Sequence, residues 1–426
     1  MRARRWRWLF VVGVAGTVAA LGMATAGAAP TTTRVSSSLT GGPGNGHSEF
    51  PALSVDGRYV VFQSGADNLV PGDTNLQTDV FLRDRVTGAI ERISVSTAGV
   101  QGVGPSGLFV PSAVTPDGRY VAFQSFARNL VPGDTNEQVD IFLRDRQAGT
   151  TTRVSVDSSG AQATGGSFGA AISSDGRYVM FTSVAPNLVP DDTNGTKDVF
   201  VHDMLTRTTT RVSVKASGAQ VDEDTRAWGM SADGRFVAFQ SLAKYTSGDG
   251  NNADDGFVKD VQTGKVERVS VTGANKEIAD GSREMSISAD GRFLAFTGFP
   301  KNLNTQVYVR DRATKKTILV SATPSGKPGK FGSGSPSISP DGRYVVFGSG
   351  SPDLVPGSPD FFNTYLRDLK TGKTTLESRT STGAPIQEST LEGAMSNGGF
   401  AFVSLSTTVM PDGGDQRNAQ VYFRSL

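Results

Sequence analysis

A short step, Asp-Gly-Arg followed by an aromatic residue, recurs along the chain and constrains its fold more than any other feature. After residue 30 the step begins at Asp56, Asp117, Asp175, Asp233, Asp290 and Asp341, and a worn seventh copy begins at Asn397. The copies lie 51 to 61 residues apart. A period of this size is the signature of a repeat architecture in which each copy builds one structural unit.

Each copy divides into four short segments with the alternation or burial typical of strands. In the second copy these segments are residues 112–115, 120–125, 141–144 and 152–156. The first two are joined at Asp117-Gly118, a tight hairpin, because glycine accepts the positive φ that such turns demand. A second turn, of the form Asp-x-x-Thr-Gly, joins the third and fourth segments, as from Asp84 to Gly88.

The two ends of the chain predict how the repeats close. Residues 31–36 match the fourth strand of other copies, whereas the last copy stops after its third strand, residues 420–423. The N-terminal strand should therefore complete the last blade and remove two exposed strand edges. The predicted fold is an all-β, seven-bladed β-propeller of four-stranded blades, closed in this way and forming one domain, residues 30–426.

The repeat unit also resembles a known family. Ser-x-Asp-Gly-Arg-Tyr-Val-Ala-Phe, followed by Asp-Val-Phe-Leu-Arg-Asp-Arg-x-Thr-Gly, is similar to the TolB-type, WD40-like propeller repeat of secreted bacterial proteins. The resemblance extends over the whole chain after residue 30 and implies the propeller fold. It implies little about activity, because such repeats occur in translocation accessories, in peptidase propellers and in unassigned secreted proteins.

Residues 1–29 have the composition of a secretory signal peptide. Four arginines, Arg2, Arg4, Arg5 and Arg7, precede an apolar stretch from residue 9 to about residue 20, and small residues follow. We predict cleavage and a secreted or periplasmic location, with an uncleaved membrane anchor as the alternative. Both the general and the twin-arginine export routes stay open. The chain has no cysteine, so no disulfide stabilises it outside the cytoplasm.

The charge of the chain limits its partners. Without the four arginines of residues 1–29, the formal net charge falls from +1 to −3. Such a protein lacks the basic surface that nucleic acid requires, so no nucleic-acid partner is expected. No second long apolar segment follows residue 29, so no membrane contact is expected after signal cleavage. We expect a monomer.

The loops between the second and third strands carry an acidic motif in the first three copies. Its oxygen-bearing residues are Asp73, Asn75 and Asp79, then Asp134, Asn136 and Asp140, then Asp192, Asn194 and Asp198. They present the hard oxygen ligands that Ca²⁺ prefers and are the candidate metal ligands. In the alternative interpretation, Asp and Asn form Asx turns and proline stiffens the loop. Ca²⁺ is the one cofactor that the sequence suggests.

Strand order predicts that the long loops share one face of the propeller, where a binding surface is expected. Trp228, near the channel mouth, is the candidate binding residue, with a packing role as the alternative. The third strands of six copies end in a base followed by an acid, such as Arg83-Asp84 and His202-Asp203. We interpret these pairs as turn caps and inter-blade contacts, because a binding site rarely needs six similar copies.

Two functional hypotheses follow. The first is a secreted or extracytoplasmic binding or interaction module that uses the long-loop face, with an extracellular or envelope protein or glycan as its partner. The alternative is an extracellular enzyme that degrades a polysaccharide or a peptide through loop carboxylates. The sequence presents no recognisable catalytic constellation that would decide between them.

Overall fold

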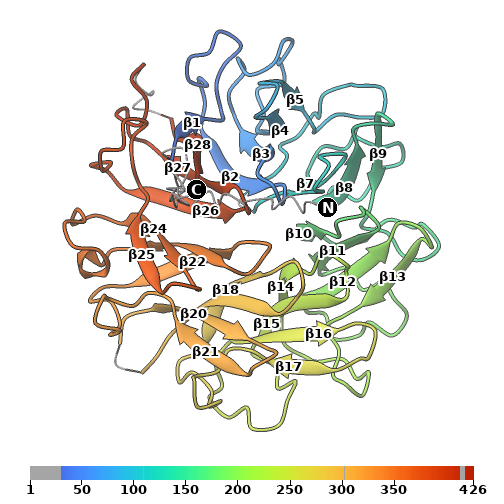
Figure 1. The fold of residues 1–426 in the computed structure, drawn as a ribbon. Helices are drawn as coiled ribbons and strands as arrows, with labels where there is room; N and C mark the ends of the chain where they lie inside the picture. Colours follow the sequence, from blue (N-terminus) through green and yellow to red (C-terminus); the bar gives the residue numbers. More distant parts are fainter. Residues whose placement is uncertain (1–29, 109, 302, 413–417) are drawn as a thin grey trace, which may run out of the picture. The chain divides into compact units, whose positions relative to one another are not determined.

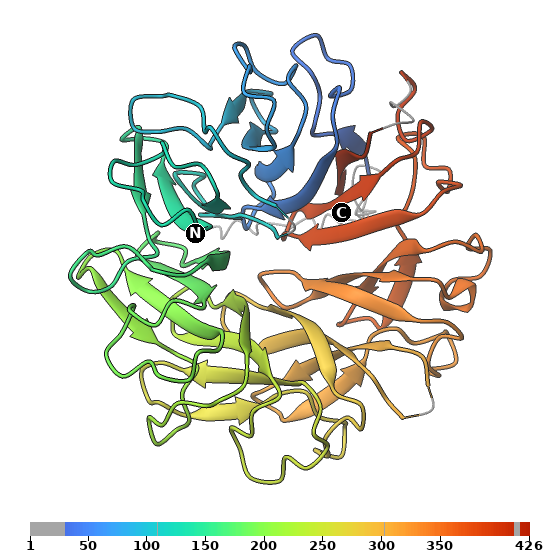
Figure 2. The ribbon, with the colours of Figure 1, turned by 180° about the vertical axis from the view of Figure 1, so that it is seen from behind.

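The computed structural model describes residues 30–108, 110–301, 303–412 and 418–426, of which residues 31 onward form one compact unit. The predicted signal peptide, residues 1–29, lies outside the described residues. No helix in the described ranges is long and apolar enough to span a membrane. Seven antiparallel sheets of four strands surround a common axis, which confirms the predicted seven-bladed propeller (Figures 1 and 2).

We name the strands of each blade a to d from the axis outward. Blades 1 and 2 consist of β2 (Ser48–Leu53), β3 (Tyr59–Ser64), β4 (Asp79–Asp84), β5 (Ile90–Arg92), and β6 (Ala113–Val114), β7 (Tyr120–Ser125), β8 (Asp140–Asp145), β9 (Thr150–Arg153). Blades 3 and 4 consist of β10 (Ser167–Ile172), β11 (Tyr178–Ser183), β12 (Asp198–Asp203), β13 (Thr208–Arg211), and β14 (Thr225–Met230), β15 (Phe236–Ser241), β16 (Asp255–Asp260), β17 (Val266–Arg268).

Blades 5 and 6 consist of β18 (Ser282–Ile287), β19 (Phe293–Gly298), β20 (Gln306–Asp311), β21 (Lys316–Leu319), and β22 (Ser333–Ile338), β23 (Tyr344–Ser349), β24 (Asn363–Asp368), β25 (Lys373–Leu376). Blade 7 consists of β26 (Thr390–Met395), β27 (Gly399–Ser404), β28 (Gln420–Ser425) and β1 (Thr32–Arg34). A short 3₁₀ helix, η1 (Pro352–Leu354), lies in blade 6.

The ring closes as the chain ends predict. Strand β1 pairs antiparallel with β28, with Thr33 opposite Phe423, and the blue and dark red segments lie side by side in Figure 1. The buried Arg34 anchors this strand through two hydrogen bonds of 2.8 and 2.9 Å to the carboxylate of Asp412. The last blade therefore contains strands from both ends of the chain, which leaves no unpaired edge at the junction.

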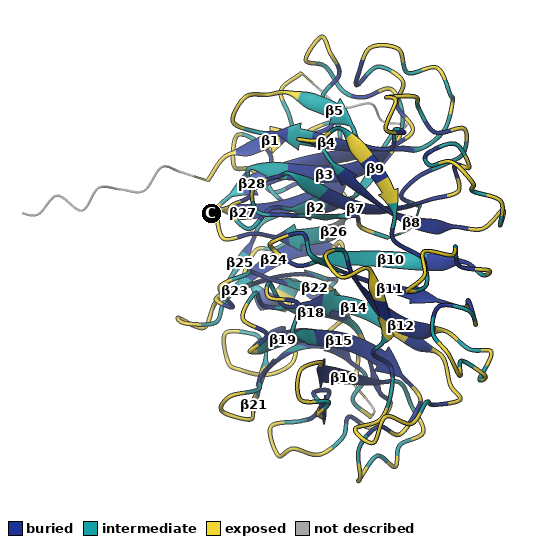
Figure 3. Ribbon diagram, turned by 90° about the vertical axis from the view of Figure 1, so that its right-hand side faces the viewer, coloured by how far each residue is buried: buried dark blue, intermediate teal, exposed yellow. Residues whose placement is uncertain are grey.

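The repeated aromatic residues of strands b and c form the core of every blade. In blade 1 the rings of Phe62 and Phe81 stack with centroids 5.9 Å apart, and in blade 7 Phe402 and Tyr422 do so at 5.5 Å. The apolar clusters also join neighbouring blades, since residues of blades 7 and 1 share one cluster. Figure 3 shows these inner strands largely buried between exposed loops. Burial of each large apolar side chain contributes about 1.5–3 kcal/mol.

The Asp-Gly-Arg-aromatic step connects one blade to the next. Gly118 has φ +70°, as the predicted hairpin requires, and a Cβ at this position would lie 2.6 Å from the ring of Tyr59 in the preceding blade. The aromatic residue of one copy thus packs under the glycine of the next. The same contact recurs between Gly176 and Tyr120. The step therefore specifies both the turn and the packing of adjacent blades.

The base and acid that end strand c have separate structural roles. Asp84 accepts hydrogen bonds of 3.0 and 2.8 Å from Arg58, the arginine of the Asp-Gly-Arg step in its own blade. This arginine lowers the pKa of Asp84. Arg83 instead donates to the backbone oxygens of Val35 and Ser37 at 3.0 and 2.9 Å, reaching the chain that leaves the preceding blade. Turn capping and inter-blade contact are both confirmed.

Candidate functional site

The two faces of the propeller differ in how they are built. Successive strands of a blade run in opposite directions, so the a–b and c–d turns share one face, which we call the short-turn face. The b–c loops and the d–a connections share the other, the long-loop face. Each d–a connection contains a small hairpin, closed in blade 1 by a bridge between Val95 and Gln101. The predicted metal ligands and Trp228 all belong to elements that meet at the long-loop face.

In blade 1 the two candidate acids lie on either side of an arginine, and the candidate asparagine bonds one of them. Arg92, the last residue of strand d, has Nη2 3.1 Å from Asp73 and Nε 3.6 Å from Asp79. Asp79 also accepts hydrogen bonds from Ser94 Oγ at 2.5 Å and from Asn75 Nδ2 at 2.8 Å. Both carboxylates are nearly inaccessible, with side-chain exposures of 4% and 0%. A guanidinium therefore occupies the position between them.

Blade 2 repeats this arrangement. Arg153 lies 3.2 Å from Asp134 and 3.5 Å from Asp140, and Asn136 donates to Asp140 at 3.1 Å. The loop is further tied to the d–a hairpin, because Gln162 donates to the hydroxyl of Thr135 at 2.6 Å. The structure thus brings the predicted ligands of each loop together, around a cation supplied by the chain itself.

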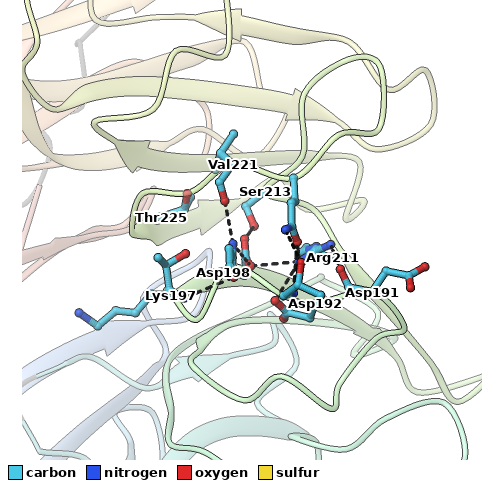
Figure 4. A network of polar contacts seen from close by, with 12 residues as sticks. Asp191, Asp192, Lys197, Asp198, Arg211, Ser213, Val221 and Thr225 are labelled. Atoms are coloured by element: carbon cyan, nitrogen blue, oxygen red, sulfur yellow. Dashed lines mark hydrogen bonds and ion pairs between the residues drawn. The ribbon is translucent and has the colours of Figure 1, made fainter.

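Blade 3 shows the same network in close view (Figure 4). Nη1 of Arg211 lies 3.0 Å from Asp192 and 3.3 Å from Asp198. Asn194 donates to Asp198 at 3.0 Å, and Ser213 donates to the other oxygen of that carboxylate. Blade 4 keeps the pattern in a weaker form, with Arg268 3.6 Å from Asp249 and 3.3 Å from Asp255.

Burial governs the ionisation of these carboxylates. It raises the pKa of the side chains of Asp73, Asp79, Asp140 and Asp192 above the ordinary value for aspartate. The neighbouring arginine lowers each of these pKa values, but by less than burial raises it. Removal from water disfavours the charged form of an acid, and a nearby cation restores part of the loss. The arginine is therefore the group that allows two acids to stay close together in a buried position.

Blades 5 and 6 show what the first residue of strand c contacts when strand d does not end in an arginine. In blade 6 strand d ends at Leu376, strand c begins with Asn363, and Ser378 donates to the amide oxygen of Asn363 at 2.8 Å. In blade 5 Leu319 and Gln306 take these places. A serine hydroxyl thus bonds the first residue of strand c in either case. That residue is an aspartate in blades 1 to 4, where strand d ends in arginine, whereas in blade 7 strand d ends at Arg34 and strand c begins with Gln420.

This internal comparison supports the structural interpretation of the loop motif. In the described ranges no group of three or more His, Asp or Glu side chains is placed to hold a metal ion. Calcium binding by these nine residues stays a prediction, and it would require a cation to compete with the arginine. Sequence reasoning missed two parts of the network: Arg92, and Gln101, whose side-chain amide donates to the hydroxyl of Thr74 at 2.8 Å. The signal was present, because an arginine ends strand d wherever both acids are found in the first four copies.

Trp228 lies in strand a of blade 4, next to the propeller axis. It occupies an irregularity in the pairing of β14 with β15, between Ala227 and Gly229, and is half-buried. Its indole Nε1 donates to Gln240 at 3.0 Å. The guanidinium carbon of Arg226 lies 5.5 Å from the centroid of its ring. The tryptophan is therefore held in one orientation and partly exposed beside a cation.

A cavity of about 440 Å³ opens on the long-loop face of the same blade. The d–a connection that precedes blade 4 and the b–c loop of that blade line it, and the residues include Lys215, Asp222, Glu223, Leu242 and Lys244. Glu223 lies two residues before β14, and Leu242 directly follows β15. The cavity therefore lies at the ends of the two strands that carry Arg226, Trp228 and Gln240.

Comparison with solved structures shows what the fold is similar to. TolB from Acinetobacter baumannii is 19% identical, with a TM-score of 0.43, and the match covers 79% of this chain and 65% of that one. An oligogalacturonate lyase from Vibrio parahaemolyticus is 13% identical, with a TM-score of 0.56, over 93% of this chain and 96% of that one. The β-propeller domain of the Trilobed protease from Pyrococcus furiosus is 12% identical, with a TM-score of 0.54, over 89% and 93%.

The two likenesses with TM-scores above 0.5 confirm the β-propeller fold that the repeat predicts, and at such identities they show the fold alone. The chain spans less than two thirds of the length of the TolB protein that it matches. No protein-family model matches the chain, and no curated protein does. The Pyrococcus furiosus propeller is described as having an open velcro topology, whereas β1 closes the last blade here.

Proposed function

We propose that the protein is an exported binding module that recognises a protein or glycan partner with its long-loop face. The observation that carries the proposal is the cavity of about 440 Å³ on the long-loop face of blade 4, lined by Lys215, Glu223 and Leu242 among others. Ligand sites are concave and combine apolar surface with a few polar groups, and the lining of this cavity contains both kinds of side chain. The short-turn face supports no comparable role, since its acids and bases hold the turns and the blades together.

Export and the place of action belong to the same proposal. The composition of residues 1–29 supports secretion or a periplasmic location, and the partner is then an extracellular or envelope component. We expect the exported form to act as a monomer, without nucleic acid and without a membrane contact. Cell fractionation checks this directly: recovery of the shortened chain in the cytoplasm contradicts it.

Site-specific cross-linking tests the binding face. A photo-reactive amino acid replaces Leu242, which is 50% exposed at the cavity, or Leu205, which is 72% exposed in a c–d turn of the short-turn face. We expect a specific adduct in the envelope or extracellular fraction from position 242 and none from position 205. Equal adducts from both positions, or none from either, contradict the proposed face.

The enzyme hypothesis is tested separately, with a turnover assay on the purified protein. Turnover of a polysaccharide or peptide panel by the purified protein, lost when an acid at the cavity such as Glu223 is replaced by glutamine, would replace binding by catalysis. The fold of an oligogalacturonate lyase is similar, but its substrate is a property of that protein.

A further inference from the structure

In blades 1 to 3 an asparagine of the b–c loop holds the d–a connection that precedes the blade. The amide nitrogen of Asn187 donates to the backbone oxygen of Gln162 at 2.9 Å, and the backbone N–H of Thr164 donates to the amide oxygen of Asn187 at 2.9 Å. One primary carboxamide thus bonds a backbone oxygen and the backbone N–H two residues later. Asn129 in blade 2 and Asn68 in blade 1 form the same pair of bonds. The carboxamide therefore ties the connection to the loop in three successive blades.

Blade 4 has no asparagine at this position. Its b–c loop is one residue shorter than that of blade 3, because Ala243 and Asp249 are six positions apart, whereas Ala185 and Asp192 are seven apart. Tyr245 occupies the position two residues after the alanine, which is an asparagine in blades 1 to 3. The loop of blade 4 therefore differs from the others in the residue that forms the contact.

The side chain of Tyr245 is turned into the core. The centroid of its ring lies 5.0 Å from that of Phe239 and 4.9 Å from that of Phe257. Its hydroxyl lies 2.9 Å from the hydroxyl of Thr225 and 3.4 Å from the backbone oxygen of Ser213. The tyrosine therefore fills the core and does not replace the carboxamide.

The backbone groups that the carboxamide would bond are free in blade 4. Gln220 and Gln162 each lie five positions before strand a, so the counterparts of Gln162 O and Thr164 N are Gln220 O and Asp222 N. Neither of these two groups forms a hydrogen bond within the ranges that the structure describes. Gln220, Asp222 and Lys244 line the cavity of about 440 Å³. The cavity therefore lies where the other blades have their asparagine.

We propose that this cavity binds the side-chain carboxamide of an asparagine or glutamine in a partner polypeptide. The amide NH₂ of the partner donates to Gln220 O, and its amide oxygen accepts from Asp222 N, as the carboxamide of Asn187 does in the preceding blade. The buried side chains of Val221 and Ala243 form the apolar part of the lining and contact the methylene groups of the partner residue. The inference rests on the proposed function and names the chemical class of its partner.

The geometry of the contact favours a polypeptide over a glycan. A primary carboxamide presents its oxygen and one N–H on the same edge, and the asparagines of blades 1 to 3 use that edge. The acetamido group of an amino sugar is a secondary amide, whose trans form places N–H and C=O on opposite sides. Such a group can bond Gln220 O or Asp222 N, but not both at once.

Calorimetry of the exported protein tests the ligand class. The probes are three peptides, acetyl-Ala-X-Ala-N-methylamide, in which X is asparagine, aspartate or leucine, so that the asparagine peptide alone carries a primary carboxamide. We expect it to bind at least about tenfold more tightly than the other two, because it alone forms both hydrogen bonds. Equal affinity for the three peptides, or no binding of the asparagine peptide, overturns the proposal.

Two further probes test the source of the carboxamide. Free asparagine has the same side chain without a polypeptide, and the trimer of N-acetylglucosamine has secondary amides on a glycan. We expect both to bind more weakly than the asparagine peptide. Tighter binding of free asparagine overturns the polypeptide as the source, and tighter binding of the sugar overturns the choice of a polypeptide over a glycan.

A loop graft fills the site from within the chain. Replacement of residues 244–248 by residues 186–191 gives blade 4 the longer loop of blade 3 with its asparagine. We expect the graft to melt at or above the temperature of the unaltered chain and to bind the asparagine peptide at least about tenfold more weakly, because its own carboxamide occupies the two backbone groups. Unchanged binding by the folded graft overturns the site.

A single substitution removes one bond and leaves the cavity open. Asp222→Pro has no backbone N–H and should bind the asparagine peptide about fivefold or more weakly. Asp222→Ala is the matched control, because it keeps the N–H and removes the carboxylate, and it should bind as the unaltered chain does. Unaltered binding by Asp222→Pro, or equal losses in the two variants, overturns the backbone contact.

The two proposals fail in different ways. If position 242 gives a specific adduct while the three peptides bind equally or not at all, the binding face stands and the carboxamide is excluded. If position 242 gives no adduct and no probe binds, both are wrong. A preference for the asparagine peptide that the loop graft abolishes supports the ligand class, whatever protein the cross-linking recovers.

Discussion

Buried ion pairs in this propeller are best understood residue by residue, because each acid has an identifiable partner. Asp79 faces Arg92, Asn75 and Ser94, and no part of its carboxylate is left to water. The pairing itself adds little to stability, since removing two charges from water offsets most of their attraction. Removing one member has a larger effect, because the other charge stays buried without compensation.

The variant Arg92→Leu tests this asymmetry. It leaves Asp73 and Asp79 buried without a cation and should lower the free energy of unfolding by about 3–5 kcal/mol. The triple variant Asp73→Ser, Asp79→Asn, Arg92→Leu introduces the residues of blade 6, where Ser358, Asn363 and Leu376 occur. It should unfold within about 1 kcal/mol of the unaltered chain in urea. A larger loss in the triple variant than in the single one contradicts the structural role.

The calcium prediction concerns the same acids, Asp73 and Asp79, and a thermal melt tests it. Because an arginine already neutralises part of each carboxylate pair, we expect the melting temperature to be the same in EDTA and in millimolar Ca²⁺. A calcium-specific rise that Mg²⁺ does not produce, and that disappears in the variant Asp73→Asn, Asp79→Asn, would instead establish these loops as metal sites. Ligand bound only to the folded state at ~100 times its Kd adds about 2.7 kcal/mol, which a melt detects readily.

The glycine of the repeat step allows a similar test with a built-in control. Gly118→Ala introduces a side chain at φ +70° and also places Cβ against the ring of Tyr59. The first effect costs about 1–2 kcal/mol, and overpacking adds about 1–3 kcal/mol. Gly99→Ala, at φ +77° in open space, should show the first effect alone. Equal losses in urea unfolding would show that the inter-blade contact contributes nothing.

At the scale of single elements, the end of strand c responds to pH. The arginine of the Asp-Gly-Arg step lowers the pKa of the acid that ends the strand, and for Asp368, paired with Arg343 at 3.0 Å, it lowers the pKa to about 2. An acid with a lowered pKa in the fold stabilises the fold above its ordinary pKa near 3.8, and this stability is lost as the pH falls toward about 2.

The variant Arg343→Gln isolates one of these pairs. We expect it to be less stable than the unaltered chain at neutral pH, with the difference shrinking as the pH falls through about 2 and vanishing below it, where Asp368 is protonated in both. Urea unfolding across this pH range measures the difference. Arg207→Gln, which removes an exposed arginine outside these pairs, should differ by a constant amount at every pH. A difference for Arg343→Gln that is independent of pH contradicts the pairing.

At the scale of the whole molecule, closure depends on one short strand from the start of the propeller. Deletion of residues 31–34 removes β1 and leaves the edge of β28 without a partner. We expect a lower melting temperature and association into dimers or larger species through the free edge, measured by size-exclusion chromatography with light scattering.

A peptide that carries the sequence of residues 31–36 should restore the monomer by completing blade 7. A shortened chain that stays monomeric and melts as the unaltered protein does would contradict closure by β1. The predicted monomer is tested by the same chromatography of the unaltered protein.

Sequence alone determined the parts of the structure that are encoded locally and repeated. The period of the Asp-Gly-Arg step, the hairpin glycines and the missing fourth strand of the last copy are enough to predict seven blades and their closure, because strand pairing within a blade joins neighbours in the chain. The face that carries the long loops follows from strand order. Blades 5 to 7 keep the same four-stranded fold, although their b–c loops lack the full acidic motif.

Only the tertiary structure decided which groups the loop side chains contact. Asp79 and Arg92 are 13 residues apart in the sequence, and the motif alone leaves calcium binding and Asx turns open as alternatives. The fold adds that the guanidinium lies between the two acids. The cavity in blade 4 likewise depends on which loops the ring brings together. Which charged groups pair in a buried, low-dielectric position depends on the distance between them in space, and a repeat pattern does not give that distance.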